Sequence, residues 1–213
     1  MAADTMEKFD QAAATWDDEP RRVRLADEIT AAILGSVRIT PHMEVLDYGC
    51  GTGLITLRLQ PLVRSITGAD TSGGMLEVLR EKARSRSVEN VRIVKLDPEG
   101  GGGIPGRFHL IVCGMTLHHV PDVASLLQDF SRLLLPGGVL AVADLDAEDG
   151  SFHGDKISSI HAGFERGAMG DMLRKAGFVD IRDATAATIE KRAETGETRK
   201  YSVFLMTARK QGL

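Results

Sequence analysis

Cysteines and metal-binding motifs are scarce in this sequence. Only two of its 213 residues are cysteines, Cys50 and Cys113, and they lie far apart in the chain. No pair of Cys-x-x-Cys motifs and no His-Glu-x-x-His motif is present. Disulfide frameworks and protein zinc sites need such repeated spacings. We therefore expect neither a disulfide framework nor a bound metal.

Long apolar runs are also lacking. No stretch approaches the ~18 apolar residues of a membrane-spanning helix. The first residues, 1–8, do not contain the basic segment followed by an apolar segment that a secretory signal needs. We therefore expect no membrane span and a cytoplasmic location.

An excess of positive charge is the third feature that the sequence lacks. Its 26 Lys and Arg residues are outnumbered by 30 Asp and Glu residues, which gives a net charge of −4. Nucleic-acid-binding proteins are usually basic because they neutralise phosphates. We therefore expect a small-molecule partner and no nucleic acid. A length of 213 residues with 43% hydrophobic residues suits one domain with a real core, residues 1–213.

The most informative segment is residues 45–54, Val-Leu-Asp-Tyr-Gly-Cys-Gly-Thr-Gly-Leu. Residues 43–46 predict a short buried strand, and the apolar spacing from Leu54 predicts a helix. A strand that turns through glycines into a helix forms a ligand site in α/β sheets, because glycine lets a ligand approach the main chain closely. The dinucleotide pattern G-x-G-x-x-G would place its third glycine at Leu54, so a nicotinamide cofactor is disfavoured. Asp47, just before the glycines, suits a ligand that carries a positive charge.

Three further apolar segments predict strands that end in polar or glycine positions. Residues 66–70 end in Asp70, residues 91–96 precede Asp97, and residues 108–113 precede Gly114. The carboxyl ends of parallel strands share one edge of a sheet, so we expect these residues and Asp47 to share one crevice.

Helices and a hairpin complete the predicted α/β pattern. A helix over residues 22–34 is expected to stop at Gly35. Ser72 and Asp122 are expected to cap two more helices, and the glycine-rich residues 98–106 predict a loop. Residues 178–189 and 201–210 predict two antiparallel strands.

The pattern Asp47-x-Gly49-x-Gly51-x-Gly53 closely resembles motif I of the class I S-adenosylmethionine-dependent methyltransferases. Residues 133–140, Leu-Leu-Leu-Pro-Gly-Gly-Val-Leu, resemble the entry to the fifth strand of that family. Residues 9–17 and 117–122 resemble two signatures of its ubiquinone/menaquinone-biosynthesis-like branch. The resemblance extends from Phe9 to the C-terminus.

This resemblance implies the fold in detail. It implies a Rossmann-like α/β domain with a seven-stranded, mostly parallel sheet in the order 3-2-1-4-5-7-6, an antiparallel strand 7 and helices on both faces. It also implies an N-terminal helical lid over residues 1–35, and an insertion over residues 146–170 that lines the substrate site.

The resemblance further implies that the chain binds S-adenosyl-L-methionine and releases S-adenosyl-L-homocysteine. Gly49, Gly51 and Gly53 would pass under the cofactor. Asp47 would face its amino group, and Asp70 would bind its ribose hydroxyls. The remaining expected cofactor contacts are Trp16, Cys50, Thr71, Met75, Asp97, Pro98, Gly114, Met115 and His118.

Purely structural roles are the alternative for several of these residues. Asp47 and Asp70 can stabilise helix starts, and Met75 and Trp16 can pack in the core. Pro98 departs from the family pattern, in which the residue after Asp97 commonly offers its N–H to the adenine ring. Either Glu99 supplies that donor or the hydrogen bond is absent.

Methyl transfer to an oxygen, nitrogen or carbon atom of a small molecule is the expected activity. The sulfonium methyl is already activated, so the main task is to align the nucleophile in line and to exclude water. A general base is needed only for a nucleophile that stays protonated. His119, His153 and His161 are candidate bases, and structural or surface roles are the alternative for each.

Two other functions stay open at this point. One is a cofactor-binding module of the same fold without transfer activity, since a fold does not fix a function. The other is a nicotinamide-dependent oxidoreductase, against which the glycine spacing argues. A homodimer is a further prediction.

Overall fold

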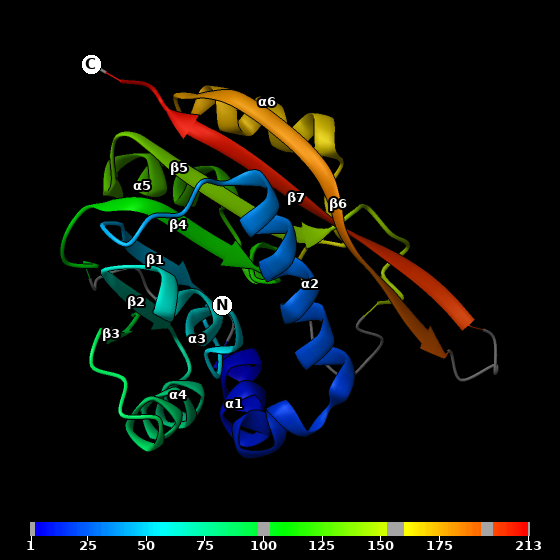
Figure 1. Ribbon diagram of the computed structural model, residues 1–213. Helices are drawn as coiled ribbons and strands as arrows, with labels where there is room; N and C mark the ends of the chain where they lie inside the picture. The colour runs from blue at the N-terminus through cyan, green and yellow to red at the C-terminus, as the bar shows by residue number, and fades with distance from the viewer. Residues whose placement is uncertain (1–2, 98–102, 153–159, 193–197, 213) are drawn as a thin grey trace.

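The computed structural model describes residues 3–97, 103–152, 160–192 and 198–212. Figure 1 shows a sheet with helices on both faces. The helices are α1 (Ala3–Ala12), α2 (Pro20–Ser36), α3 (Leu54–Leu59), α4 (Gly73–Ser85), α5 (Val123–Leu133) and α6 (Arg166–Lys175), with short 3-10 helices η1 (Ala13–Asp18), η2 (Gln60–Leu62) and η3 (Leu117–His119). The strands are β1 (Glu44–Tyr48), β2 (Ser65–Asp70), β3 (Val91–Lys95), β4 (Phe108–Gly114), β5 (Leu134–Leu145), β6 (Phe178–Arg192) and β7 (Thr198–Lys210).

The seven strands form one sheet in the order β3-β2-β1-β4-β5-β7-β6. Strands β1 to β5 pair in parallel, and β7 is antiparallel to both β5 and β6. The predicted strand order and the antiparallel β7 are therefore confirmed. The order in which successive strands are added to the sheet reverses between β1 and β4, and open α/β sheets bind ligands at such a position.

Alternating side chains of the central strands bury two apolar layers. On one face, Ile29 and Ile33 of α2 and Ile55 of α3 pack with Val45 and Leu110. On the other face, the buried residues of α5 and α6 pack with their strand partners. The near-continuous apolar runs in the sequence follow from burial of the sheet on both faces.

The two predicted helix caps are confirmed. Ser72 Oγ accepts a hydrogen bond of 3.1 Å from the Met75 N–H at the start of α4. Asp122 Oδ1 accepts one of 2.9 Å from the Ser125 N–H at the start of α5. Each side chain thus satisfies a main-chain donor that the first turn of a helix leaves unpaired.

Some predicted boundaries were wrong. Helix α2 continues through Gly35 to Ser36, where the Val37 N–H donates to Ile33 O at 2.8 Å. Strand β1 continues past Leu46 to Tyr48, because its pairing with both neighbouring strands continues. Asp47 therefore lies within the strand and is buried. The hairpin strands β6 and β7 are longer than predicted, and Figure 1 shows them extending beyond the rest of the sheet.

The N-terminal segment is attached to the elements around the glycine loop by two carboxylates. Asp10 Oδ1 accepts from Ser72 Oγ at 2.5 Å and from the Gly74 N–H at 2.9 Å, and the Ser72 hydrogen bond lowers the pKa of Asp10. Asp17 accepts from Thr52 Oγ1 at 2.6 Å and from Lys82 Nζ at 2.5 Å. These bonds hold α1 and η1 beside the carboxyl ends of the strands.

Within the described part of the chain, every helix is too short or too polar to cross a lipid bilayer.

Candidate functional site

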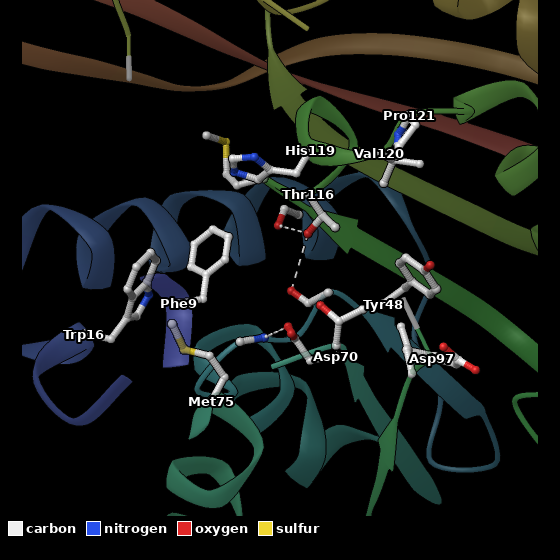
Figure 2. A pocket seen from close by; sticks show the side chains of 16 residues that line it. Phe9, Trp16, Tyr48, Asp70, Met75, Asp97, Thr116, His119, Val120 and Pro121 are labelled. Atoms are coloured by element: carbon white, nitrogen blue, oxygen red, sulfur yellow. Dashed lines mark hydrogen bonds between the residues drawn. The ribbon is translucent and has the colours of Figure 1, made fainter. Parts of the chain in front are cut away.

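A cavity of about 270 Å³ lies at the carboxyl ends of β1, β2 and β4. Figure 2 shows the side chains around it: Phe9 and Trp16 on one side, Met75 and Asp70 below, Tyr48 and Asp97 opposite, and His119 above. It is lined by Phe9, Trp16, Tyr48, Gly49, Gly51, Asp70, Thr71, Met75, Leu96, Asp97, Gly114, Met115, Thr116, His119, Val120 and Pro121.

Asp70 ends β2 and fixes the main chain on both sides of the cavity. Its Oδ2 accepts from the Gly51 N–H at 2.8 Å, and its Oδ1 accepts from the Ser72 N–H at 2.9 Å. Burial raises the pKa of Asp70, and the hydrogen bonds from the main chain oppose this shift. A carboxylate with two oxygens can accept further hydrogen bonds, so Asp70 remains able to bind hydroxyl donors.

Gly51 leaves open space in the cavity. Its φ is +53°, a conformation that residues with a Cβ adopt at a cost. A Cβ added there would point to the cavity and would meet only the Met75 sulfur, at 4.0 Å. A bare main chain at this position therefore preserves room for a ligand.

The other two glycines of the loop serve packing. A Cβ at Gly49 would lie 2.2 Å from Thr116 Oγ1, and a Cβ at Gly53 would lie 2.3 Å from Leu79 Cδ1. Real Cβ atoms essentially never approach another heavy atom closer than 3.0 Å, so the neighbouring side chain would have to move in both cases. Gly49 therefore allows the β4 loop to pack closely, and Gly53 allows α4 to do so.

Thr116 connects the loops after β1 and β4. Its hydroxyl donates to Gly114 O at 3.0 Å, with a longer contact of 3.4 Å to Gly49 O (Figure 2). Met115, the residue between, has a φ of +53°, which is uncommon for a residue with a side chain. Backbone strain of this kind is concentrated at functional sites.

Asp47 lies beneath the glycine loop. It is 1% exposed, and its Oδ2 accepts a hydrogen bond of 2.6 Å from Thr56 Oγ1. Burial raises the pKa of Asp47 to about 7, against the opposing effect of the Thr56 hydrogen bond. Asp47 lines a small neighbouring cavity of about 120 Å³, which shares Trp16, Gly49, Gly114 and Met115 with the main cavity.

The histidines after β4 are buried and ordered by an acid. Asp144, near the end of β5, lies 2.6 Å from His118 Nδ1 through its Oδ1. Burial alone would raise the pKa of Asp144, but His118 and main-chain donors lower it, so the carboxylate is ionised and accepts the Nδ1 proton. The ring of His119 packs at 4.1 Å from His118 and at 5.3 Å from Phe9, measured between ring centroids.

The structure brings nine of the predicted cofactor contacts to the cavity. They are Trp16, Gly49, Gly51, Asp70, Thr71, Met75, Asp97, Gly114 and Met115, and the candidate base His119 lines it too. Their roles stay predictions.

The other predicted residues lie elsewhere. Asp47 and Cys50 line the small neighbouring cavity, Gly53 packs on Leu79, and His118 borders a separate chamber. His161 bonds to Val120 O at 3.0 Å through Nε2, and its ring packs beside Phe164. Pro98 and His153 lie outside the described residues.

Six residues that line the cavity were not predicted as contacts. Leu96 ends the predicted strand segment 91–96, and Val120 and Pro121 lie within the signature at residues 117–122, so these motifs were the available signal. Phe9 and Trp16 belong to the same N-terminal signature, of which only Trp16 was selected. No pattern in the sequence indicated Tyr48 or Thr116.

Comparison of the sequence with known proteins finds a methyltransferase domain over residues 45–138. An uncharacterized methyltransferase of Schizosaccharomyces pombe is 34% identical over 151 residues, which are 64% of this chain and 53% of that protein. A ubiquinone biosynthesis O-methyltransferase of Colwellia psychrerythraea is 30% identical over 158 residues, 67% of this chain and 64% of that protein. The chain thus spans between about half and two thirds of the length of these relatives.

Solved structures share the fold. The YcgJ protein from Bacillus subtilis has a TM-score of 0.74 at 18% identity, over 87% of this chain and 99% of that chain. Phosphoethanolamine N-methyltransferase 2 of Haemonchus contortus, in complex with S-adenosyl-L-methionine, has a TM-score of 0.67 at 16% identity, over 85% of this chain and 52% of that chain. At such low identity these likenesses establish the fold alone.

Residues 45–138 therefore match a methyltransferase domain, and the sheet order and the glycine loop agree with the class I S-adenosylmethionine-dependent methyltransferase fold. Relatives named for ubiquinone and menaquinone biosynthesis are similar to this chain over 64% and 45% of their own lengths.

Substitution Gly51→Ala should weaken ligand binding in the cavity. The added methyl group occupies space that the ligand needs, which lowers the affinity. The positive φ separately lowers the free energy of unfolding by about 1 kcal/mol. We expect the affinity for S-adenosylhomocysteine, measured by calorimetry, to fall at least tenfold. Gly137→Ala is the matched control, because Gly137 also has a positive φ (+75°) and its Cβ would meet no atom within 4 Å. Equal affinities of the two variants would contradict this role of Gly51.

Substitution Asp47→Asn should change how stability depends on pH. The pKa of Asp47, about 7 in the folded chain, is above its ordinary value of 3.8, so the folded state retains a proton that the unfolded state loses. The contribution of Asp47 to the free energy of unfolding therefore decreases as pH rises from about 4 to 7, by up to ~1.4 kcal/mol per pH unit. An amide does not titrate in this range, so the substitution should remove the decrease.

Urea unfolding of both proteins between pH 5 and 8 measures the difference. The control is Asp129→Asn, which changes an exposed aspartate and should retain the pH dependence of the original chain. If Asp47→Asn retains it as well, the raised pKa of Asp47 is wrong.

Proposed function

We propose that this protein transfers the methyl group of S-adenosyl-L-methionine to an oxygen, nitrogen or carbon atom of a small organic molecule. The observation that carries this proposal is the cavity at the carboxyl ends of β1, β2 and β4, where a bare main chain at Gly51 faces the carboxylate of Asp70. The names of the sequence relatives and the ligand of the Haemonchus contortus enzyme support it.

The residues around the cavity fit this cofactor. Asp70 would accept hydrogen bonds from the ribose hydroxyls, as carboxylates do in other nucleotide-binding βαβ units. Gly49 and Gly51 would pass beneath the ligand, and Met75 and Asp97 would lie on either side of its base. Asp47 would stabilise the cationic amino end from beneath the loop. In the Asp47 position, a nearby cation would favour the ionised carboxylate.

When bound, the cofactor would supply a methyl group on a positively charged sulfur, and that sulfur would keep the electron pair of the carbon–sulfur bond that breaks as the acceptor bonds to the methyl carbon. The protein must place the acceptor in line and keep water out. Phe9 and Trp16, held by the bonds of Asp10 and Asp17, cover one side of the cavity. We therefore propose that residues 1–35 act as its lid.

Where the acceptor atom carries a proton, we propose that His118 is the general base that removes it. Asp144 accepts the Nδ1 proton of His118, which orients the ring and stabilises the imidazolium that forms. Asp144 is thus a positioning residue. His119 is the alternative base, because it lines both the cofactor cavity and the neighbouring chamber that His118 borders.

A second candidate function is a module of the same fold without methyl transfer. The [4+2]-cyclase SpnF shares the fold, with a TM-score of 0.69 at 18% identity over 88% of this chain and 81% of that chain. Its name shows that this fold also hosts another reaction. A cytoplasmic location, a homodimer and the lack of a nucleic-acid partner also stay predictions.

Calorimetric titration with S-adenosylhomocysteine tests the cofactor. We expect saturable binding that Asp70→Ala weakens at least tenfold, about 1.4 kcal/mol, whereas Asp129→Asn leaves it unchanged. NADH should give no heat. Incubation with methyl-labelled S-adenosylmethionine and a panel of phenols, amines and acidic carbon compounds then tests transfer. Binding without any labelled product would favour the module without transfer, and folded protein that binds nothing would exclude both.

The pH dependence of transfer tests the His118–Asp144 pair. With an acceptor that carries a proton, we expect kcat to rise with pH through one ionisation and His118→Gln to abolish this rise. Asp144→Asn should lower kcat about 10²-fold or more while leaving the KM for S-adenosylmethionine nearly unchanged. An unaltered pH profile in His118→Gln, with the profile lost in His119→Gln instead, would transfer the role to His119.

A further inference from the structure

A second chamber of about 300 Å³ adjoins the cofactor cavity. The two share four lining residues, so a molecule in one lies against the same side chains as a molecule in the other. The shared residues are Phe9, Trp16, Met115 and His119. The chamber is completed by Arg21, Arg22, Leu25, His118, Phe152, Ile189 and Lys191.

The apolar part of the chamber comes from three distant segments. Leu25 lies on α2, Phe152 follows β5, and Ile189 lies on the extended part of β6. Phe152 and Ile189 are buried, and the Phe152 ring packs at 5.1 Å from Tyr201. These walls suit a ring or a short hydrocarbon body rather than a chain of polar groups.

Charge in the chamber has one sign. Among its lining residues, all of which the structure describes, three are cationic and none is Asp or Glu. Arg22 stacks its guanidinium 3.7 Å from the Trp16 ring centre and donates to Trp16 O at 3.1 Å. Within the described ranges Arg22 forms no ion pair, whereas Arg21 has a 3.9 Å contact with Glu19.

Partial burial of Arg22 disfavours its charged form, and a bound anion would offset this effect. Burial is the main cause that lowers the pKa of Arg22, and the neighbouring Arg21 lowers it further. Nearby Glu19 and Asp17 act in the opposite direction. An arginine has five N–H donors in a planar fork that matches a carboxylate or a phosphate. Stacking on Trp16 fixes the plane of that fork before a ligand arrives.

Lys191 adds a second cation from the hairpin. Its Nζ lies 3.9 Å from the centre of the Phe152 ring and donates to Phe152 O. These two interactions place the amine beside an aromatic wall of the chamber.

We propose that this chamber binds the methyl acceptor, and that the acceptor is a small organic acid with an apolar or aromatic body and one anionic group that pairs with Arg22 and Lys191. This inference rests on the proposed methyl transfer and names its substrate class. The accepting atom has to lie at the wall formed by Phe9, Trp16, Met115 and His119, because these residues line both chambers.

Binding of four matched compounds to the protein saturated with S-adenosylhomocysteine tests the proposal. They are 4-hydroxyphenylacetate, the phosphorus acid 4-hydroxybenzylphosphonate, the neutral 4-hydroxyphenylacetamide and the cation tyramine. We expect one or both acids to bind at least tenfold more tightly than the amide, tyramine to bind weakest, and the preference to shrink in high salt. The two acids distinguish a carboxylate from a phosphate-like group.

Substitutions of the two cations test where the anionic group of the ligand binds. Arg22→Gln and Lys191→Met should each weaken binding of the preferred acid about tenfold and leave binding of the amide and of S-adenosylhomocysteine unchanged. Arg24→Gln is the matched control, because Arg24 is exposed on the same helix and does not line the chamber. A midpoint of thermal unfolding equal to that of the original chain would show that each variant is folded.

Three results would overturn the proposal. One is equal affinity for the acid and the amide. Another is an absence of binding by both acids at millimolar concentration. The third is a variant pattern in which Arg22→Gln weakens S-adenosylhomocysteine, since the cation would then serve the carboxylate of the cofactor. If S-adenosylhomocysteine fails to bind the original chain, the proposed function fails, and titration of the acids without it still tests the chamber.

Discussion

The carboxylate of Asp70 holds the cofactor side of this molecule together. It ties the end of β2 to the glycine loop through Gly51 and to the start of α4 through Ser72. Ser72 in turn caps α4 and donates to Asp10 of the N-terminal helix. Strand, loop, helix and N-terminal segment are therefore positioned by one short chain of hydrogen bonds, and the open space above Gly51 depends on all of them.

Much of the fold was predictable because the determining signals are local. Apolar runs, glycines and helix caps each act over a few residues, and the family resemblance supplied the strand order. Asp47 was misplaced because strand pairing, which involves residues far away, extends β1 past it. The contacts of Tyr48 and Thr116 were missed for the same reason, since no spacing reveals which side chains loop packing turns toward a cavity.

The boundary of the family match separates two parts of the site. Residues 45–138 include the glycine loop, Asp70, Asp97 and the β4 loop, so the matched domain contains most of the first cavity. The cations and most of the apolar walls of the second chamber come from α2, the segment after β5 and the hairpin, outside that match. The residues proposed to select the methyl acceptor therefore lie mostly outside the matched domain.

Trp16 is the single tryptophan of the chain, and it lies in the wall between the two chambers. Its indole lies against the Arg22 guanidinium and makes an edge contact with the Phe9 ring, 5.6 Å away between centroids. The tryptophan fluorescence of the protein therefore comes from a residue in the wall between the two chambers. Filling either compartment alters its surroundings, so the protein has a built-in optical reporter that needs no label.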